Sequence, residues 1–462
     1  MSESSSIAAL VEALRREIAR LAAGDRLPSS RDLVRRHEVS PVTVSRAIAL
    51  LAAEGVVVTR PGSGTFVARR RARTEEADTS WQAVALAGRS IDTRGVSGLL
   101  TSPPPGTITM AGGYLHESLQ PTRALASALA RAARRPDAWD RAPTIGLLPL
   151  RALFARMAGG EPDDVVITGG GQNALSLALR AIAAPGSPLL VESPTYTGAL
   201  AAARAAGLRP VPVPVDAEGI RPDLLADAFA MSGARAVYCQ PTFHNPTGAV
   251  LSEDRRSQVV DVARAAGAFI VEDDFARCLG HGGHVPRPLF SDDRDGTVVY
   301  LTSLTKPAAP SLRVGALLAR GPVLERLRAL RFVDDFFVSR PLQEAAVELL
   351  STPAWDRHLR TLSSALRERC ALLAREIPGV RLPLGGLHLW VGVHGSAAGL
   401  VEAARARGVL VSSGREHFAA EPPGEYLRMS FAAADLSDLA KGARRLSSGL
   451  TFESTGRLTV EP

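Results

Sequence analysis

The sequence predicts a large α/β domain, with a mostly parallel sheet and helices on both faces, preceded by a small helical unit that ends in a β-hairpin. After residue 108, alanine-rich helical stretches alternate with short apolar strands. Before residue 70, the hydrophobic period is helical and then changes to that of a hairpin. Charge also divides the chain, because residues 1–73 hold 13 Arg against 7 acidic residues and so carry six of the seven net positive charges. A basic unit joined to a nearly neutral body indicates that the front of the molecule meets a polyanion.

Three helices are expected in the first unit. One apolar stripe predicts a helix over residues 7–21 that ends at Gly24, and its members are Ile7, Leu10, Val11, Leu14, Ile18 and Leu21. Ser29 with Asp32 three residues later predicts the capped start of a second helix, which runs to about His37. Ser40 followed by Pro41 predicts the start of a third helix, which runs to about residue 51.

A hairpin follows these helices. Gly55 ends the third helix, and two apolar runs, 56–60 and 65–69, flank a Pro-Gly-Ser-Gly turn at residues 61–64. Three helices followed by a hairpin form a winged helix-turn-helix. In such a unit the third helix enters the major groove of DNA by its N-terminal end, where we expect Val42, Thr43, Ser45 and Arg46 to be exposed.

This unit resembles the GntR family of bacterial regulators over residues 5–68. The resemblance rests on the segments 26–33, 39–44 and 53–67, which read RLPSSRDL, VSPVTV and AEG…GSGTFV. It implies that the residues touching double-stranded DNA are Arg31, Ser40, Thr43, Ser45, Arg46, Gly62, Ser63 and Gly64. Pro41 and Ser45 depart from the family, which often carries Arg or Asn after the cap and Arg at position 45. A winged helix that makes only protein contacts is the alternative.

The chain is expected to comprise residues 1–70 as the winged helix, 71–107 as a linker, 108–450 as the large domain and 451–462 as a tail. The linker region opens on an arginine cluster at 69–73, passes through mixed charge and closes on a proline triplet at 103–105, a composition typical of a solvated, semi-rigid tether. The arginine cluster is either a sequence-independent phosphate contact or a solvated charge run.

The large domain contains five short apolar runs that read as strands, at residues 164–168, 188–192, 236–239, 268–272 and 297–301. Ligands in such folds collect at the carboxyl ends of the strands. The residues that follow the strands there, or lie near the end of the chain, are Gly171, Gln172, Tyr196, Asn245, Asp273, Ser303, Lys306, Arg313 and Arg428.

Lys306 is the most informative of these residues. The chain has 54 basic residues, of which only Lys306 and Lys441 are lysines, so position 306 is expected to need something that a guanidinium cannot provide. A primary amine can lose its proton and form a Schiff base with an aldehyde, whereas guanidinium stays protonated. The alternative is a surface lysine, like Lys441.

Together these residues match pyridoxal 5'-phosphate. Lys306 suits its aldehyde, a carboxylate at Asp273 suits the pyridine nitrogen, Asn245 suits the phenolic oxygen and Tyr196 suits a ring face. A glycine turn that opens a helix suits a phosphate, as do the side chains of Gln172, Ser303 and Arg313. Taken singly, the residues have structural explanations: Tyr196 as core, Asp273 as a strand-end cap and Arg428 in a surface pair.

The large domain resembles fold-type I (class I/II) aminotransferases over about residues 108–450, and its combination with a GntR-type front resembles the MocR subfamily of regulators. This resemblance implies a head-to-tail homodimer with the cofactor at the subunit interface. It also implies that Arg428 grips the α-carboxylate of an amino-acid-like ligand.

Three residues depart from the aminotransferase pattern. Phe275 stands where relatives place a Tyr that helps to bind the phenolic oxygen. Arg141 lies where relatives carry a Tyr-Gly pattern that often contacts the partner's phosphate. His244 precedes Asn245, and it either lines the pocket or packs as a neutral histidine.

Composition excludes several other classes of protein. No apolar run is long enough to span a membrane and the first residues lack an export signal, so a cytoplasmic protein is expected. The chain has three scattered cysteines, too few for a disulfide framework or a closed metal site, and no metal is expected.

Two functions remain open from the sequence. The first is a transcriptional regulator that senses an amino acid, an amine or pyridoxal phosphate itself through Schiff-base chemistry at Lys306. The second is a working aminotransferase with an appended DNA-binding unit. The effector, the target genes and the choice between activation and repression are not encoded in any recognisable motif.

Overall fold

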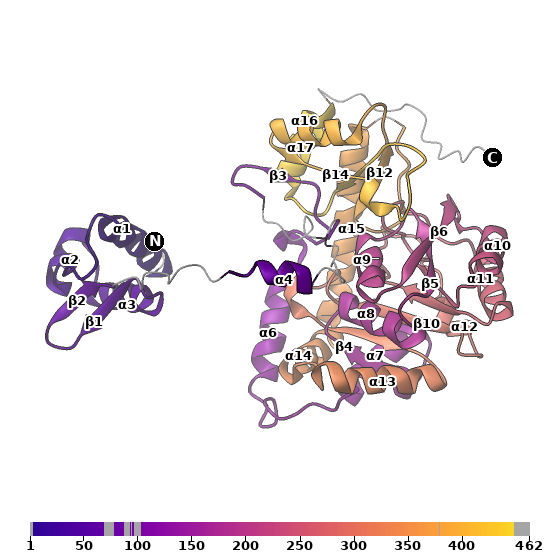
Figure 1. The fold of residues 1–462 in the computed structure, drawn as a ribbon, viewed down its shortest axis with the longest axis horizontal. Helices are drawn as coiled ribbons and strands as arrows, with labels where there is room; N and C mark the ends of the chain where they lie inside the picture. Colours follow the sequence, from indigo (N-terminus) through magenta and orange to yellow (C-terminus); the bar gives the residue numbers. More distant parts are fainter. Residues whose placement is uncertain are drawn as a thin grey trace. The chain divides into compact units, whose positions relative to one another are not determined.

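The computed structural model describes residues 3–68, 78–86, 93, 95–96, 103–377 and 379–447. The chain forms two compact units, Met1–Ser90 and Ile91–Pro462, each with its own apolar core (Figure 1). The tail expected at 451–462 and the arginine cluster at 69–73 lie outside the described residues. Among the helices of the described part, none has the length and apolar character needed to cross a membrane.

The small unit is the predicted winged helix-turn-helix. Its elements are α1 (Glu3–Ile18), α2 (Ser30–His37), α3 (Pro41–Ala53), β1 (Val57–Arg60) and β2 (Gly64–Val67), and a short helix, α4 (Ser80–Ala85), lies in the predicted linker. Both predicted caps are confirmed, because the side chain of Ser29 accepts from Asp32 N and that of Ser40 accepts from Thr43 N. The strands pair antiparallel from Val57↔Val67 to Arg60↔Gly64, which leaves residues 61–63 as the turn.

Two details of this unit were predicted wrongly. The first helix ends at Ile18 and not at Gly24, so Leu21 lies outside the helix and is exposed. Thr43 is buried at 5% exposure and is not part of the exposed end of α3, because its Oγ1 lies 2.8 Å from Ser40 Oγ, inside the N-cap.

The large unit is built on an eight-stranded sheet of order β4-β11-β10-β9-β8-β5-β6-β7. Its strands are β4 (Val165–Thr168), β5 (Pro188–Ser193), β6 (Arg209–Asp216), β7 (Gly219–Ile220), β8 (Ala236–Cys239), β9 (Phe269–Asp273), β10 (Val298–Ser303) and β11 (Gly315–Leu318). The five predicted strands are all present, and the pairs β10–β9, β9–β8, β8–β5 and β5–β6 are parallel. The mostly parallel sheet is therefore confirmed, with β11 and β7 as antiparallel additions.

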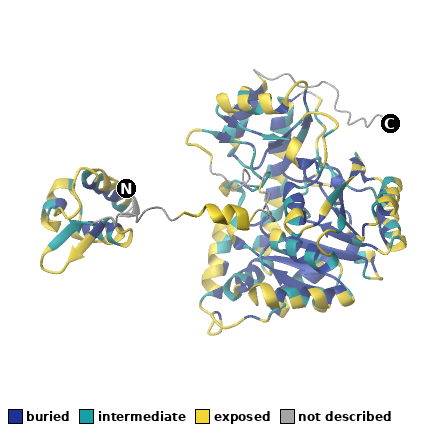
Figure 2. Ribbon diagram, viewed as in Figure 1, coloured by how far each residue is buried: buried dark blue, intermediate teal, exposed yellow. Residues whose placement is uncertain are grey.

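Helices cover both faces of this sheet, as predicted. One apolar cluster joins it to α6 (Thr122–Ala132), α7 (Leu148–Ala158), α10 (Pro222–Ser232), α11 (Glu253–Ala265), α12 (Leu289–Asp292) and α14 (Arg340–Leu350). A second cluster joins the opposite face to α8 (Gly171–Ile182), α9 (Thr197–Ala205) and α13 (Pro322–Asp335). The sheet is the most buried part of this unit, with the helices exposed on their outer sides (Figure 2).

The end of the chain adds a smaller lobe to the large unit. Three strands, β12 (His388–Gly392), β15 (Tyr426–Ser430) and β14 (Ser412–Ser413), form one sheet, and β3 (Ile108–Thr109) pairs with β13 (Val409–Leu410) in another. They share an apolar cluster with α15 (Pro353–Arg375), α16 (Ala397–Ala406) and α17 (Leu436–Ser447). Single-turn helices lie at Glu117–Leu119, Pro162–Asp164, Pro310–Leu312 and Arg415–His417. The predicted domain over 108–450 thus contains two lobes.

Candidate functional site

A cavity of about 680 Å³ lies in the large unit, beyond the carboxyl ends of the parallel strands β9 and β10. All the cofactor and carboxylate-binding residues predicted from the sequence line it: Gly171, Gln172, Tyr196, Asn245, Asp273, Ser303, Lys306, Arg313 and Arg428. The sequence analysis missed other lining residues, among them Val96, Tyr114, Gln240, Thr305 and His388. The structure therefore brings the predicted set together in one place.

Lys306 lies three residues after β10 and points its amine into this cavity. Its Nζ donates to the backbone oxygen of Gly113 at 2.6 Å and lies 4.0 Å from the ring centre of Tyr114. Burial lowers the pKa of Lys306 to about 7, helped by the positive charges of Arg428 and Arg313 and opposed by Asp273. Near neutral pH much of this amine is therefore unprotonated and nucleophilic. Lys441, in contrast, is exposed and paired with Asp438. The alternative of a surface lysine therefore applies to Lys441 and not to Lys306.

One end of the cavity is suited to an anion. Helix α8 begins at Gly171, so its first backbone N–H groups have no partner within the helix and face this end. Arg313 lies beside them: its Nη2 donates to Gly169 O at 2.8 Å and its Nη1 to Thr305 Oγ1 at 3.4 Å. Ser303 Oγ donates to Thr305 Oγ1 at 2.8 Å. A guanidinium, two hydroxyls and a helix N-terminus form a set that binds phosphate.

Gly170 and Gly198 permit close approaches around this end. Gly170 has φ +94°, and a Cβ there would lie 2.8 Å from Arg313 Nη2. A Cβ on Gly198 would lie 2.3 Å from Cζ of Tyr196, whose ring folds back over that residue. The amide of Gln172 is engaged at both ends, because its Nε2 donates to Gly198 O and its Oε1 accepts from Tyr196 Oη. The backbone N–H of Gln172, and not its side chain, is thus the group that faces an anion.

The opposite end of the cavity presents the carboxylate of Asp273. Its Oδ2 accepts from Tyr238 Oη at 2.6 Å and from Gln240 Nε2 at 3.1 Å, while its Oδ1 is buried without a hydrogen-bond partner. Burial raises the pKa of Asp273 to about 6, although the bonds from Tyr238 and Gln240 oppose the shift. A protonated ring nitrogen would supply the donor that Oδ1 lacks.

Arg428 occupies the third side of the cavity and is 2% exposed, so it is not part of a surface pair. Its Nη1 donates to Asn245 Oδ1 at 3.3 Å and its Nη2 to Ala111 O at 2.8 Å, while Nε has no partner. Burial lowers the pKa of Arg428 to about 10. Within the described part of the chain no carboxylate lies at ion-pair distance from it, so this guanidinium can bind an incoming carboxylate.

The structure also shows where the three residues that depart from the aminotransferase pattern lie. Phe275 lines the cavity and offers no hydroxyl. His244 does not line it: it is buried, its Nδ1 lies 2.8 Å from Thr247 Oγ1, and its Nε2 lies 3.3 Å from Glu192 Oε2. His244 is therefore packed away from the cavity. Arg141 is exposed and does not line this cavity.

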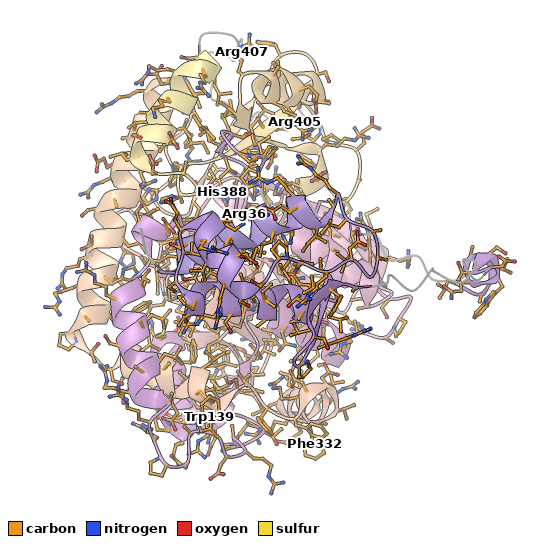
Figure 3. The ribbon with its side chains drawn as sticks, turned by 90° about the vertical axis from the view of Figure 1, so that its left-hand side faces the viewer. Arg36, Trp139, Phe332, His388, Arg405 and Arg407 are labelled. Carbon is orange, nitrogen blue, oxygen red and sulfur yellow. The ribbon has the colours of Figure 1, made fainter. Side chains whose placement is uncertain are left out.

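His388, labelled in Figure 3, was not identified from the sequence. It begins β12, and its Nε2 lies 3.3 Å from Gly112 O. Burial and the nearby charges of Arg428 and Lys306 hold the pKa of His388 well below its usual value, so the ring is neutral. An alternating pattern in residues 387–391 could have indicated a strand, but not that His388 faces the cavity.

The predicted DNA-binding residues form a second candidate site, on the small unit. Arg31, Ser40, Ser45 and Arg46 are exposed around the start of α2 and α3, and Gly62 and Ser63 are exposed at the hairpin turn. Gly64 is half-buried against Arg26, and Thr43 is buried as described above. The exposed members combine positive charge with a helix N-terminus, as a DNA-binding surface requires.

Comparison with known proteins finds a family match for each of the two units. The model for "Aminotransferase class I and II" matches residues 110–446, and that for "Bacterial regulatory proteins, gntR family" matches residues 7–67. The HTH-type transcriptional regulator YdfD of Bacillus subtilis is 27% identical over 92% of this chain and 91% of its own length. The 2-aminoadipate transaminase of Thermus thermophilus is 33% identical over 75% of this chain and 90% of its own.

A solved aminotransferase structure has the same fold as the large unit. The α-aminoadipate aminotransferase LysN of Thermus thermophilus, in complex with N-(5'-phosphopyridoxyl)-L-leucine, superposes with a TM-score of 0.74 and 32% identity, over 80% of this chain and 97% of that one. The cofactor of this fold is pyridoxal 5'-phosphate. The residues present here fit it, because the cavity supplies an amine, an anion-binding end and a buried carboxylate oxygen that lacks a donor. The chain thus belongs to the class I and II aminotransferase family and, through its gntR-type unit, to the MocR subfamily of GntR-type transcriptional regulators.

Proposed function

We propose that this protein is a DNA-binding regulator whose large unit senses a small carboxylated amine, such as an amino acid, or pyridoxal phosphate itself. One observation carries the proposal: a single chain holds both a basic winged helix-turn-helix and a cavity lined by residues that fit pyridoxal phosphate. An enzyme has no use for a groove-reading helix, whereas a regulator needs both parts.

Different residues of the cavity would bind different parts of the cofactor and of the effector. When bound, the cofactor supplies an electrophilic carbon and an electron-accepting ring. Lys306 would hold it covalently, the N-terminus of α8 with Arg313 would bind its phosphate, and Asp273 would keep the ring nitrogen protonated. Tyr196 and Asn245 position the ring. Arg428 binds the carboxylate of the effector, which places the effector's amine toward Lys306.

DNA contact would use the small unit. Arg31, Ser45 and Arg46 contact the groove and backbone, and the turn Gly62 to Gly64 meets the adjacent groove. Ser40 and Thr43 fix the start of α3 through their N-cap bonds. For the effector to change this contact, it must bind unequally to two arrangements of the protein.

The active assembly we propose is a head-to-tail homodimer. Large apolar side chains exposed on the large unit support it: Trp139 is 77% exposed, and Phe332 and Phe336 are 57% and 61% exposed and in contact with each other. Both labelled members, Trp139 and Phe332, lie toward the lower end of the view in Figure 3. Asp137 pairs with Arg340, which joins the segments that carry these side chains. Exposed aromatic side chains of this kind are typical of interfaces between subunits.

Steady transamination is the second candidate. The lowered pKa of Lys306 and the likeness to a transaminase favour it. Phe275 argues against efficient turnover, because a hydroxyl near the phenolic oxygen of the cofactor is lost. The two functions are not exclusive in chemistry, but only the first uses the small unit.

The experiment is to measure binding of the purified protein to DNA from upstream of its own gene, with and without each amino acid. The proposal expects specific binding and a change in affinity of at least about fivefold with one amino acid or with the cofactor. Amino-group exchange with a 2-oxo acid at ordinary enzyme rates, about 1–1,000 s⁻¹, without any effect on DNA binding would support the second candidate.

A further inference from the structure

Val96 belongs by sequence to the segment that connects the two units, yet it lines the cofactor cavity. The composition of this segment had predicted a solvated tether over 71–107. Val96 and Gly95 are instead half-buried, and Val96 N donates to Thr93 O at 3.1 Å to close a turn. The connecting segment is therefore anchored to the large unit before the predicted domain begins.

The anchor lies against two segments that are hydrogen-bonded to each other, the start of α9 and the single-turn helix Arg415–His417. Thr195 N donates to His417 O at 2.7 Å, and His417 Nδ1 lies 2.8 Å from Thr195 O, so residues 195–197 and 415–417 are held together. Gly95 lies against both segments: a Cβ built on it would lie 3.3 Å from Cβ of Glu416 and 3.4 Å from Cβ of Thr197. Its φ of +77° favours glycine in this turn.

The ligand side of the cavity lies next to this anchor. Tyr196, which precedes Thr197, lines the cavity, and Glu416 is close enough to Arg428 to act on its charge. A ligand whose carboxylate is held by Arg428 would direct its side chain among the remaining lining residues, which include Val96 and Tyr114. Val96 supplies an aliphatic surface there.

We propose that Gly95 and Val96 form one wall of the effector site, so that the effector binds more tightly when the connecting segment is anchored on the large unit. This inference rests on the proposed sensing function. Gly95 and Val96 lie in sequence between the DNA-binding unit and the body of the large unit, so anchoring them fixes one end of the connection between the two. Because coupling is reciprocal, DNA would alter effector affinity by the same factor as the effector alters DNA affinity.

The test uses the full chain loaded with N-(5'-phosphopyridoxyl)-L-leucine, a stable adduct that combines the cofactor with an amino acid. The glycine adduct has no side chain to reach Val96 and serves as the matched ligand. Val96→Ala should weaken binding of the leucine adduct about three- to fivefold and leave that of the glycine adduct unchanged, because it removes two half-buried carbons. Val84→Ala, at an 80% exposed position in α4, should change neither.

Hydrogen exchange and DNA affinity complete the test. The leucine adduct should slow amide exchange in the peptide containing Gly95 and Val96, and should change DNA affinity more in the wild type than in Val96→Ala. Equal preference of wild type and Val96→Ala for the leucine adduct overturns the inference. If neither adduct changes the DNA affinity of the wild type, the sensing function itself is wrong. The ratio of leucine-adduct to glycine-adduct affinity in wild type and Val96→Ala still decides whether Val96 lines the effector site.

Discussion

The two units of this chain present their functional side chains in opposite ways. Arg31, Ser45 and Arg46 of the small unit are exposed, whereas Asp273 and Arg428 of the large unit are at most 4% exposed. The pKa values of Asp273 and Arg428 are strongly shifted by burial. An exposed basic surface suits a nucleic-acid polymer, because each of its many phosphates contributes a small amount of binding free energy. A buried site suits one small molecule, because its few polar groups become strong only where water is excluded.

The largest effect is expected for Lys306→Ala, which removes the amine on which covalent attachment depends. The variant should show no borohydride-trapped cofactor by mass spectrometry and no absorbance from lysine-bound cofactor, while circular dichroism stays unchanged. Lys441→Ala is the control, since Lys441 is exposed and bonded only to Asp438 among described residues. A trapped adduct on another residue of Lys306→Ala would contradict the assignment.

Removing a buried charge should stabilise the cofactor-free protein. Asp273→Asn should raise the free energy of unfolding at pH 7 by about 2–3 kcal/mol, because the folded pKa of about 6 exceeds the usual 3.8. In the wild type, protonation of Asp273 provides the same stabilisation below the unfolded pKa, and it is lost as the pH rises through 6. The free energies of unfolding of the two proteins should therefore become equal near pH 3.5. Thermal unfolding of apoprotein across this pH range is the measurement. The same variant should bind the cofactor more weakly, and a gain of stability in the holo form would argue against a ring nitrogen at Oδ1.

In the small unit, Arg46→Ala should weaken operator binding by about 1–3 kcal/mol, or roughly 5- to 150-fold. Fluorescence anisotropy at fixed salt measures this change. Arg405→Ala, which removes an equally positive and 63% exposed side chain from the large unit, is the control. Equal loss in both variants would mean that net charge, and not the recognition helix, controls binding.

The smallest effect is expected for Phe275→Tyr. A hydroxyl at this cavity-lining position can add one hydrogen bond, worth about 0.5–1.5 kcal/mol, to the phenolic oxygen of the cofactor. The pKa read from the absorbance of bound cofactor should fall by about one unit. Phe243→Tyr, at a buried position that does not line the cavity, should leave this pKa unchanged. An unchanged pKa in Phe275→Tyr would place the phenolic oxygen elsewhere.

Sequence patterns predicted the fold where local rules decide the structure. The caps at Ser29 and Ser40 and the five parallel-sheet strands follow from short-range chemistry and hydrophobic period. Strand β6 was missed because it carries three prolines, which usually argue against a strand. It is tolerated next to the short edge strand β7, which pairs with only its last two residues.

The site was predicted where residue type alone names the chemistry, as for Lys306 and Asp273. Residues that depend on long-range packing were missed. Tyr238 and Gln240 reach Asp273 from the neighbouring strand, and His388 arrives from the smaller lobe. Thr43 was wrongly predicted to be exposed. Its hydroxyl takes part in the N-cap of α3, and the sequence pattern does not show this contact.

The central claim is that occupancy of the buried site changes what the exposed site does. The most direct measurement is the operator affinity of the full-length protein as a function of pyridoxal phosphate and amino acid concentration, for wild type and Lys306→Ala side by side. We predict a ligand-dependent change of about fivefold or more in the wild type that is absent from Lys306→Ala. An affinity that is the same for both proteins at every ligand concentration would contradict the account.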